Sequence, residues 1–306
     1  MKQTRLTLLT LSCLAATQIR ADEKPTEAAA TYDGPLIQVA LLLDTSTSME
    51  GLLDQARTRM WELVTELTTA TRDGRKPRLE VGLYEYGSAG YRHLRQVKPL
   101  SDDLDGLSEK LFELDLIYPS STKKHPMPGG AEYCGQVIQS SLTELRWSQK
   151  PNDVKIIFIA GNEAFTQGPV EYLDACKLAI GQDVVVNTIF CGDWQKGYEL
   201  SWQDGALKAE GAYFNINQDQ AHAHIDAPQD AQLGELNEQL NATYIAFSSE
   251  GQAMKRRQIV QDRNASGRNA STLAGRAYAK ASSFYQNESW DLVDACANAT
   301  LDLADV

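Results

Sequence analysis

Continuous apolar runs alternate with segments of helical periodicity along most of the 306-residue chain. Residues 36–43 form a nearly unbroken apolar run, which is typical of a strand buried on both faces of a parallel sheet. Further candidate strands follow at 79–86, 154–160, 184–190 and 212–216. Between and after them lie segments with helical patterns: 52–71, 102–114, 132–145, 170–180 and 231–240. This alternation predicts an α/β fold with a doubly wound, mostly parallel sheet and helices on both faces.

One strand is expected to depart from the parallel arrangement. Residues 73–77, Asp-Gly-Arg-Lys-Pro, are rich in turn formers and lead directly into the run at 79–86. This turn favours an antiparallel edge strand at 79–86.

The two ends of the chain differ from the part between them. Residues 1–21 combine a basic start, a short apolar run and a small residue at a cleavage position, which is typical of a secretory signal peptide. An uncleaved anchor is the alternative. Residues 22–34 are interpreted as a linker, 35–248 as the main domain, and 249–306 as a polar, helical C-terminal extension. We therefore expect a secreted or periplasmic protein with no membrane span after signal cleavage.

The composition restricts the partners. The formal net charge is −12 and becomes −15 without residues 1–21, because that segment holds three basic residues and no acidic one. A chain of this charge is repelled by nucleic acid phosphates and by anionic lipid surfaces. Cys134, Cys176, Cys191 and Cys296 remain after signal cleavage, and both disulfides and buried free thiols are compatible with them.

Oxygen-bearing side chains follow the first buried strand. Asp44, Ser46 and Ser48 are spaced two residues apart between that strand and the next helix. In an open parallel sheet, ligands bind beyond the carboxyl ends of the strands. Oxygen ligands on one turn suit hard divalent cations such as Mg²⁺, Mn²⁺ or Ca²⁺. The alternative is that these residues cap the helix, but capping uses only one of them.

The Asp44-Thr45-Ser46-Thr47-Ser48 loop resembles the metal-ion-dependent adhesion site (MIDAS) of von Willebrand factor A (VWA) domains. The likeness continues in a Gly-Gly loop that begins at Gly129 and leads to Gly135, and in the run 154–160 before Gly161. It covers roughly residues 36–248. It implies a protein-binding, adhesion or assembly module in which a bound cation bridges to a partner, with the partner's acidic residue filling the open coordination position.

The second and third loops depart from the family pattern. By spacing to Gly135, Glu132 replaces the metal-binding Thr of the family, and the third-loop Asp falls on Gly161. Glu132 is a candidate direct ligand, and the alternative is that it binds a neighbouring backbone amide. Asn162 and Glu163 are candidates for contacts through water. An added carboxylate would tighten the cation while weakening the attraction for an acidic ligand.

Two further groups of residues have weaker interpretations. His222, His224 and Asp226 have a zinc-compatible composition, but such trios more often form a solvated strand edge. Trp194, Trp202 and the Asp204-Gly205 pair are expected in a loop at the same end of the sheet, where they would shape a binding rim or simply pack.

The residues favour binding over catalysis. A haloacid-dehalogenase-like hydrolase also places an Asp after its first strand, but it needs a second Asp where this chain has Ser46. The chain contains no nucleophile elbow, phosphate-binding loop or zinc-protease motif. We therefore expect a protein that is not an enzyme. The other alternative is a metal-free envelope scaffold.

Overall fold

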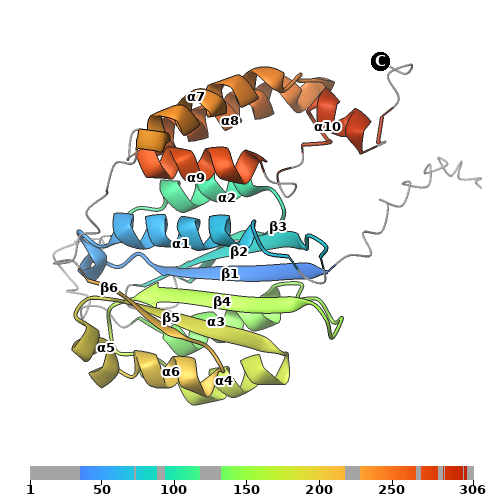
Figure 1. Cartoon of the computed structure of the whole chain (residues 1–306). Coiled ribbons are helices and arrows are strands. Elements are labelled where there is room, and N and C mark those ends of the chain that lie inside the picture. Colours follow the sequence, from blue (N-terminus) through green and yellow to red (C-terminus); the bar gives the residue numbers. More distant parts are fainter. Residues whose placement is uncertain are drawn as a thin grey trace, which may run out of the picture. The chain divides into compact units, whose positions relative to one another are not determined.

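The computed structural model describes residues 35–71, 74–87, 94–117, 132–217, 228–266, 270–281, 285, 287–298 and 300–301. One six-stranded sheet lies at its centre (Figure 1). The strands are β1 (Leu36–Asp44), β2 (Arg78–Tyr86), β3 (Arg95–Ser101), β4 (Val154–Gly161), β5 (Val184–Cys191) and β6 (Tyr213–Ile216).

The sheet order is β3-β2-β1-β4-β5-β6, and each neighbouring pair is parallel except β2 with β3. The predicted fold class is therefore confirmed. The expectation for residues 79–86 is wrong: β2 runs parallel to β1 in the interior of the sheet. The antiparallel edge strand is β3, whose sequence Arg-Gln-Val-Lys-Pro-Leu-Ser has no buried residue. An edge strand needs little apolar content, so its hydrophobic signal is weak.

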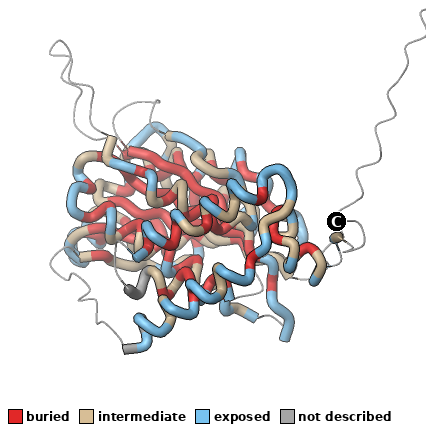
Figure 2. Tube along the Cα trace, turned by 90° about the horizontal axis from the view of Figure 1, so that it is seen from above, coloured by how far each residue is buried: buried red, intermediate tan, exposed pale blue. Residues whose placement is uncertain are grey.

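The two faces of β1 contribute side chains to two separate hydrophobic cores. Every residue of β1 after Leu36 is buried. Because successive side chains of a strand point to opposite faces, Val39, Leu41 and Leu43 join one core while Ala40 and Leu42 join the other. This explains why the sequence of the strand is an unbroken apolar run rather than an alternating one. Figure 2 shows these buried segments running through the interior.

Helices cover both faces of the sheet (Figure 1). The first core receives apolar side chains from α1 (Leu53–Leu67) and α2 (Leu104–Glu113). The second core receives them from α3 (Cys134–Glu144), α4 (Tyr172–Gly181) and α6 (Trp202–Lys208), which follows the short α5 (Trp194–Glu199). Trp194, Trp202, Asp204 and Gly205 therefore lie on helices, which corrects the expected loop.

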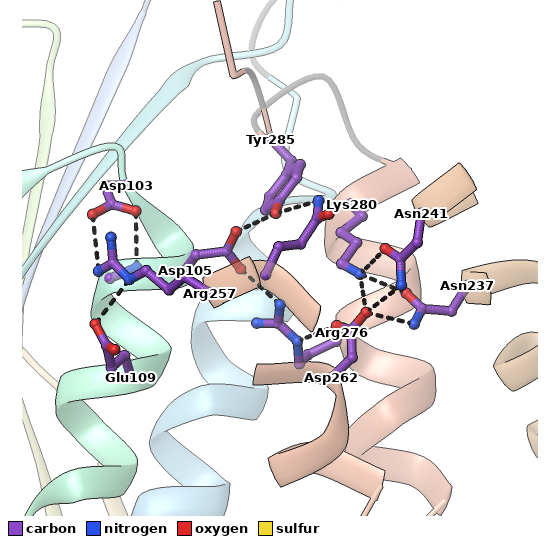
Figure 3. Close-up of polar contacts among 12 residues, drawn as sticks. Asp103, Asp105, Glu109, Asn237, Asn241, Arg257, Asp262, Arg276, Lys280 and Tyr285 are labelled. Atoms are coloured by element: carbon purple, nitrogen blue, oxygen red, sulfur yellow. Dashed lines mark hydrogen bonds and ion pairs between the residues drawn. The ribbon is translucent and has the colours of Figure 1, made fainter. Parts of the chain in front are cut away.

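The C-terminal part adds α7 (Pro228–Thr243), α8 (Ser248–Ser266), α9 (Ala270–Ala281) and α10 (Leu292–Ala297). Helix α9 packs against α1, α8 packs against α2, and α7 pairs with α9. The junction is polar: Arg276 of α9 bonds Asp105 of α2 and Asp262 of α8 (Figure 3). Helix α8 buries Gln258, Gln261 and Asp262 rather than a stripe of large apolar residues.

Two smaller questions are answered within the described residues. Cys134, Cys176, Cys191 and Cys296 are free thiols, and the first three are buried. None of the helices in this part of the chain has the length and apolar character that a membrane crossing requires.

Candidate metal centre

Backbone contacts hold the loop after β1 in place. Asp44 ends the strand, and the Thr45 amide donates to the Tyr86 carbonyl at 2.8 Å. The Ile117 amide donates to the Thr45 carbonyl at 2.8 Å, on the side of α2. Gly87 passes directly against this loop with a φ of +119°, and a Cβ there would collide with the Asp44 carboxylate. Glycine suits position 87 for two reasons: it adopts this positive φ readily, and it has no Cβ to collide with Asp44.

The loop gathers four polar side chains. The Ser46 amide donates to Asp44 Oδ1 at 2.8 Å, and the Ser46 and Ser48 hydroxyl oxygens lie 2.8 Å apart. Ser48 Oγ donates to Asn162 Oδ1 at 2.9 Å, and Asn162 Nδ2 donates back to the Ser48 carbonyl at 2.8 Å. Asp44 and Ser46 are buried, whereas Ser48 is exposed. The cluster is therefore open to solvent at Ser48.

Helix capping does not account for these residues. Ser46 is the N-cap of the short 3₁₀ turn Thr47–Met49, yet its side chain makes no capping hydrogen bond. Helix α1 begins later, after Leu52, which cannot cap through its side chain. Neither serine hydroxyl caps a helix: the two lie against each other and Ser48 bonds Asn162, while Asp44 Oδ1 accepts from the Ser46 amide within the loop.

Glu132 brings a second buried carboxyl group to the cluster. Its side chain is 1% exposed, and its amide donates to Gln167 Oε1 at 2.9 Å. By hydrogen-bond geometry neither carboxyl oxygen has a partner among the described residues, and Asp44 Oδ2 has none either, although the side chains of Asp44 and Ser46 lie near enough to affect the pKa of Glu132 through hydrogen bonding. No backbone amide of the described residues donates to the Glu132 carboxyl group. Two buried carboxyl groups without partners are costly unless something compensates them.

The electrostatics of the site agree with this geometry. Burial raises the pKa of Asp44 to about 7; hydrogen bonds from Ser46 oppose the rise, and the charge of Glu163 adds to it. Burial, followed by the negative charges of Asp44 and Glu163, raises the pKa of Glu132 to about 9. No described Lys, Arg or His forms an ion pair with these acidic residues. The site is thus short of positive charge.

The third loop contributes Asn162 because Gly161 has no room for a side chain. A Cβ on Gly161 would lie 2.5 Å from Tyr86 Oη and 3.2 Å from Asp44 Cβ. Gly161 therefore carries no side chain for steric reasons, and Asn162, the next residue, bonds Ser48. Trp202 Nε1 donates to the Glu163 carbonyl at 2.6 Å and holds this loop. Sequence reasoning did not find this contact, because the two residues are 39 positions apart.

The side chains fit a hard divalent cation better than a softer metal. The donors are carboxylate, hydroxyl and amide oxygens. Within the described residues, no cluster of three or more His, Cys, Asp and Glu is suited to a metal. A cation here would therefore be held by Asp44, Glu132 and the two serine hydroxyls, with water in the remaining positions, as Mg²⁺ prefers.

The structure leaves other predicted residues apart from this cluster. Trp202 is completely buried against Phe165 and Phe190. Trp194 is 49% exposed on α5 and packs on Tyr213. The proposed zinc trio, His222, His224 and Asp226, and the Gly-Gly loop at 129–130 lie outside the described residues.

The chain has a doubly wound α/β fold with a mostly parallel sheet. Its central first strand, buried from Ile37 to Asp44, places the Asp44-to-Ser48 loop at the carboxyl edge of the sheet, between the ends of β2 and β4.

Comparisons with known proteins give distant structural similarities. No family model and no curated protein matches the chain. Proximal thread matrix protein 1 from the mussel byssus is 12% identical with a TM-score of 0.43; the match covers 62% of this chain and 44% of that one. BatB from Bacteroides thetaiotaomicron is 12% identical with a TM-score of 0.42, covering 74% and 99%. The SpRpn10 VWA domain is 13% identical with a TM-score of 0.42, covering 60% and 89%.

Proposed function

We propose that this protein is an extracytoplasmic, metal-dependent protein-binding module for adhesion or assembly. One observation carries the proposal: Asp44 and Glu132 are buried carboxyl groups with oxygens that have no hydrogen-bond partner among the described residues, beside two serine hydroxyls at the carboxyl edge of the sheet. A divalent cation supplies the positive charge that no described Lys, Arg or His brings to these two carboxylates. Mg²⁺ is the proposed ion, with Mn²⁺ or Ca²⁺ as substitutes.

Each residue has a distinct proposed role. Asp44, Ser46, Ser48 and Glu132 hold the ion, while Asn162 orients Ser48 through two hydrogen bonds. Glu163 acts through its negative charge. The bound ion supplies an electrophilic position that accepts an oxygen atom of a protein partner. The family resemblance implies that this oxygen belongs to an acidic side chain.

We propose a binding function rather than a catalytic one. Ser46 stands where a haloacid-dehalogenase-like hydrolase needs an acid/base Asp, so we propose no turnover. The strongly acidic surface supports a protein partner rather than nucleic acid. Residues 1–21 support export to the periplasm or the exterior. A metal-free scaffold is the competing function, and a metal titration separates the two.

The test is calorimetric titration of Mg²⁺, Mn²⁺ and Ca²⁺ into chelator-treated protein. Saturable one-to-one binding is expected for the wild type, with loss in Asp44→Ala and weakening in Glu132→Ala. The matched control is Asp174→Ala, which removes an exposed carboxylate of α4. If the wild type binds no cation, or if Asp44→Ala binds as well as the wild type, the protein does not work through this site.

A further inference from the structure

Two neighbouring aromatic side chains of α5 are exposed to solvent. Trp194 is 49% exposed and Tyr198 is 45% exposed. Both lie against Tyr213 of β6, with ring centroids 4.6 Å apart for Trp194 and 6.1 Å apart for Tyr198, and their own centroids lie 6.5 Å apart. The three rings therefore form one open aromatic surface, which we call the α5 platform. The other tryptophans of the chain are at most 6% exposed: Trp61, Trp147, Trp202 and Trp290.

Local packing fixes the platform in position. Helix α5 lies on the same side of the sheet as α4 and α6 (Figure 1). Gly197, between the two exposed rings in the sequence, faces the sheet: a Cβ there would collide with Tyr213 Oη and with the ring of Phe190. Tyr213 Oη also donates to the Trp194 carbonyl at 3.1 Å, which joins α5 to β6. Because these contacts hold the backbone and the rings pack on one another, a ligand would order few groups when it binds.

The side chains that flank the platform in the sequence are acidic. Asp193 directly precedes Trp194 and Glu199 directly follows Tyr198, and both are exposed. Asp193 Oδ1 accepts from the Lys196 amide at 3.0 Å, which keeps this carboxylate at the start of α5. The Lys196 side chain is two positions from each ring and so points away from both of them. The platform therefore combines aromatic faces with negative charge, on a chain whose net charge is −12.

We propose that the α5 platform binds the guanidinium group of arginine side chains in a basic segment of a protein partner. A guanidinium group is attracted to the face of a Trp or Tyr ring and stacks flat on it. Its N–H groups then remain free to donate paired hydrogen bonds to a carboxylate such as Asp193 or Glu199. A lysine ammonium gains the attraction to the ring without the flat stacking. This surface needs no metal ion, so the inference is independent of the proposed metal centre.

The experiment uses the full chain with a chelator present, so that the metal centre plays no part. The probes are capped tetrapeptides of arginine, of lysine, and of citrulline, the neutral isostere of arginine. Physiological salt suppresses general attraction to an acidic protein. Calorimetry measures affinity, and acrylamide quenching of tryptophan fluorescence reports on Trp194, because the other tryptophans are buried. We expect tetra-arginine to bind saturably and to protect Trp194, tetralysine to bind more weakly, and tetracitrulline not to bind.

Substitutions locate the binding surface. Replacing both exposed rings, by Trp194→Ala with Tyr198→Ala, should weaken tetra-arginine binding by about tenfold. Trp194→Phe should keep most of the affinity, because it retains an aromatic face at the same position. Tyr278→Ala is the matched control: it removes an aromatic side chain that is 51% exposed on α9, and the affinity should not change.

Two results would overturn the inference. Equal binding of tetracitrulline and tetra-arginine would show that the platform does not select a cation. An affinity for tetra-arginine that survives the double substitution would show that the attraction comes from the acidic surface as a whole. Neither result bears on the metal-dependent function, since every measurement is made without the cation.

Discussion

Arg276 of α9 bonds Asp105 of α2 at 2.6 Å, across a separation of 171 residues in the sequence. The same guanidinium contacts Asp262 at 2.8 Å, and Lys280 also bonds Asp262 (Figure 3). Burial acts to raise the pKa of Asp262, but the charges of Arg276 and Lys280 outweigh it and lower the pKa. The C-terminal helices are therefore joined to the sheet domain through a buried, nearly balanced set of charges.

Removing Arg276 should destabilise this junction strongly. In Arg276→Ala, Asp105 and Asp262 lose their shared cation while staying buried, which costs about 3–5 kcal/mol of unfolding free energy. Urea denaturation measures the change. Lys177→Ala is the control: it breaks an ion pair whose lysine side chain is 76% exposed, worth about 0–1 kcal/mol. Equal effects of the two variants would contradict a buried network that holds the helices.

Gly161 should not tolerate even one added carbon. Gly161→Ala places a methyl group against Tyr86 and Trp202, so we expect a loss of about 1–3 kcal/mol. Gly181→Ala is the matched variant, because a Cβ at that end of α4 meets nothing within 4 Å. It should stabilise the protein by about 0.4–1 kcal/mol, since alanine restricts the unfolded chain. Thermal unfolding of both variants checks the opposite signs.

The stability of the metal-free protein should depend on pH through its two buried carboxyl groups. Their pKa values rise on folding, to about 7 for Asp44 and about 9 for Glu132. The folded state therefore binds more protons than the unfolded state above about pH 4, and this pair destabilises the fold increasingly from there to about pH 9. In chelator, wild-type stability should fall relative to Glu132→Gln as the pH rises from 5 to 9. A constant difference between the two denaturation curves would show that Glu132 does not titrate in this way.

Cation binding should release protons at neutral pH. The pKa values of both carboxyl groups are raised, to about 7 for Asp44 and about 9 for Glu132, so we expect both to lose bound protons when they ionise to bind a metal. The affinity for Mg²⁺ should therefore increase between pH 6 and pH 9. Calorimetry at pH 7 in two buffers with different ionisation enthalpies counts the protons released. Binding enthalpies that do not change with the buffer would contradict proton displacement at this site.

The position of the loop after β1 was predictable because its pattern is local. Asp44, Ser46 and Ser48 lie within five residues, directly after an apolar run that only a doubly buried strand explains. The strand's end then sets where the loop lies in the sheet. Glu132 was identified by its spacing to Gly135, but the contact of its carboxyl group with the first loop depends on the packing of a distant segment.

By itself, the sequence determined the fold class, five of the six strands and the place of the polar loop that follows β1, since the hydrophobic period and turn chemistry act over a few positions. Tertiary structure alone decided that β2 is an interior parallel strand, that Trp202 is buried and holds the Glu163 carbonyl, and that Asn162 bonds Ser48. It also decided that polar C-terminal helices dock through Arg276 and Asp105. These contacts join residues that are many positions apart in the sequence. Steric fit and charge pairing between two such segments produce no periodic pattern in the sequence of either segment, so the sequence alone does not reveal them.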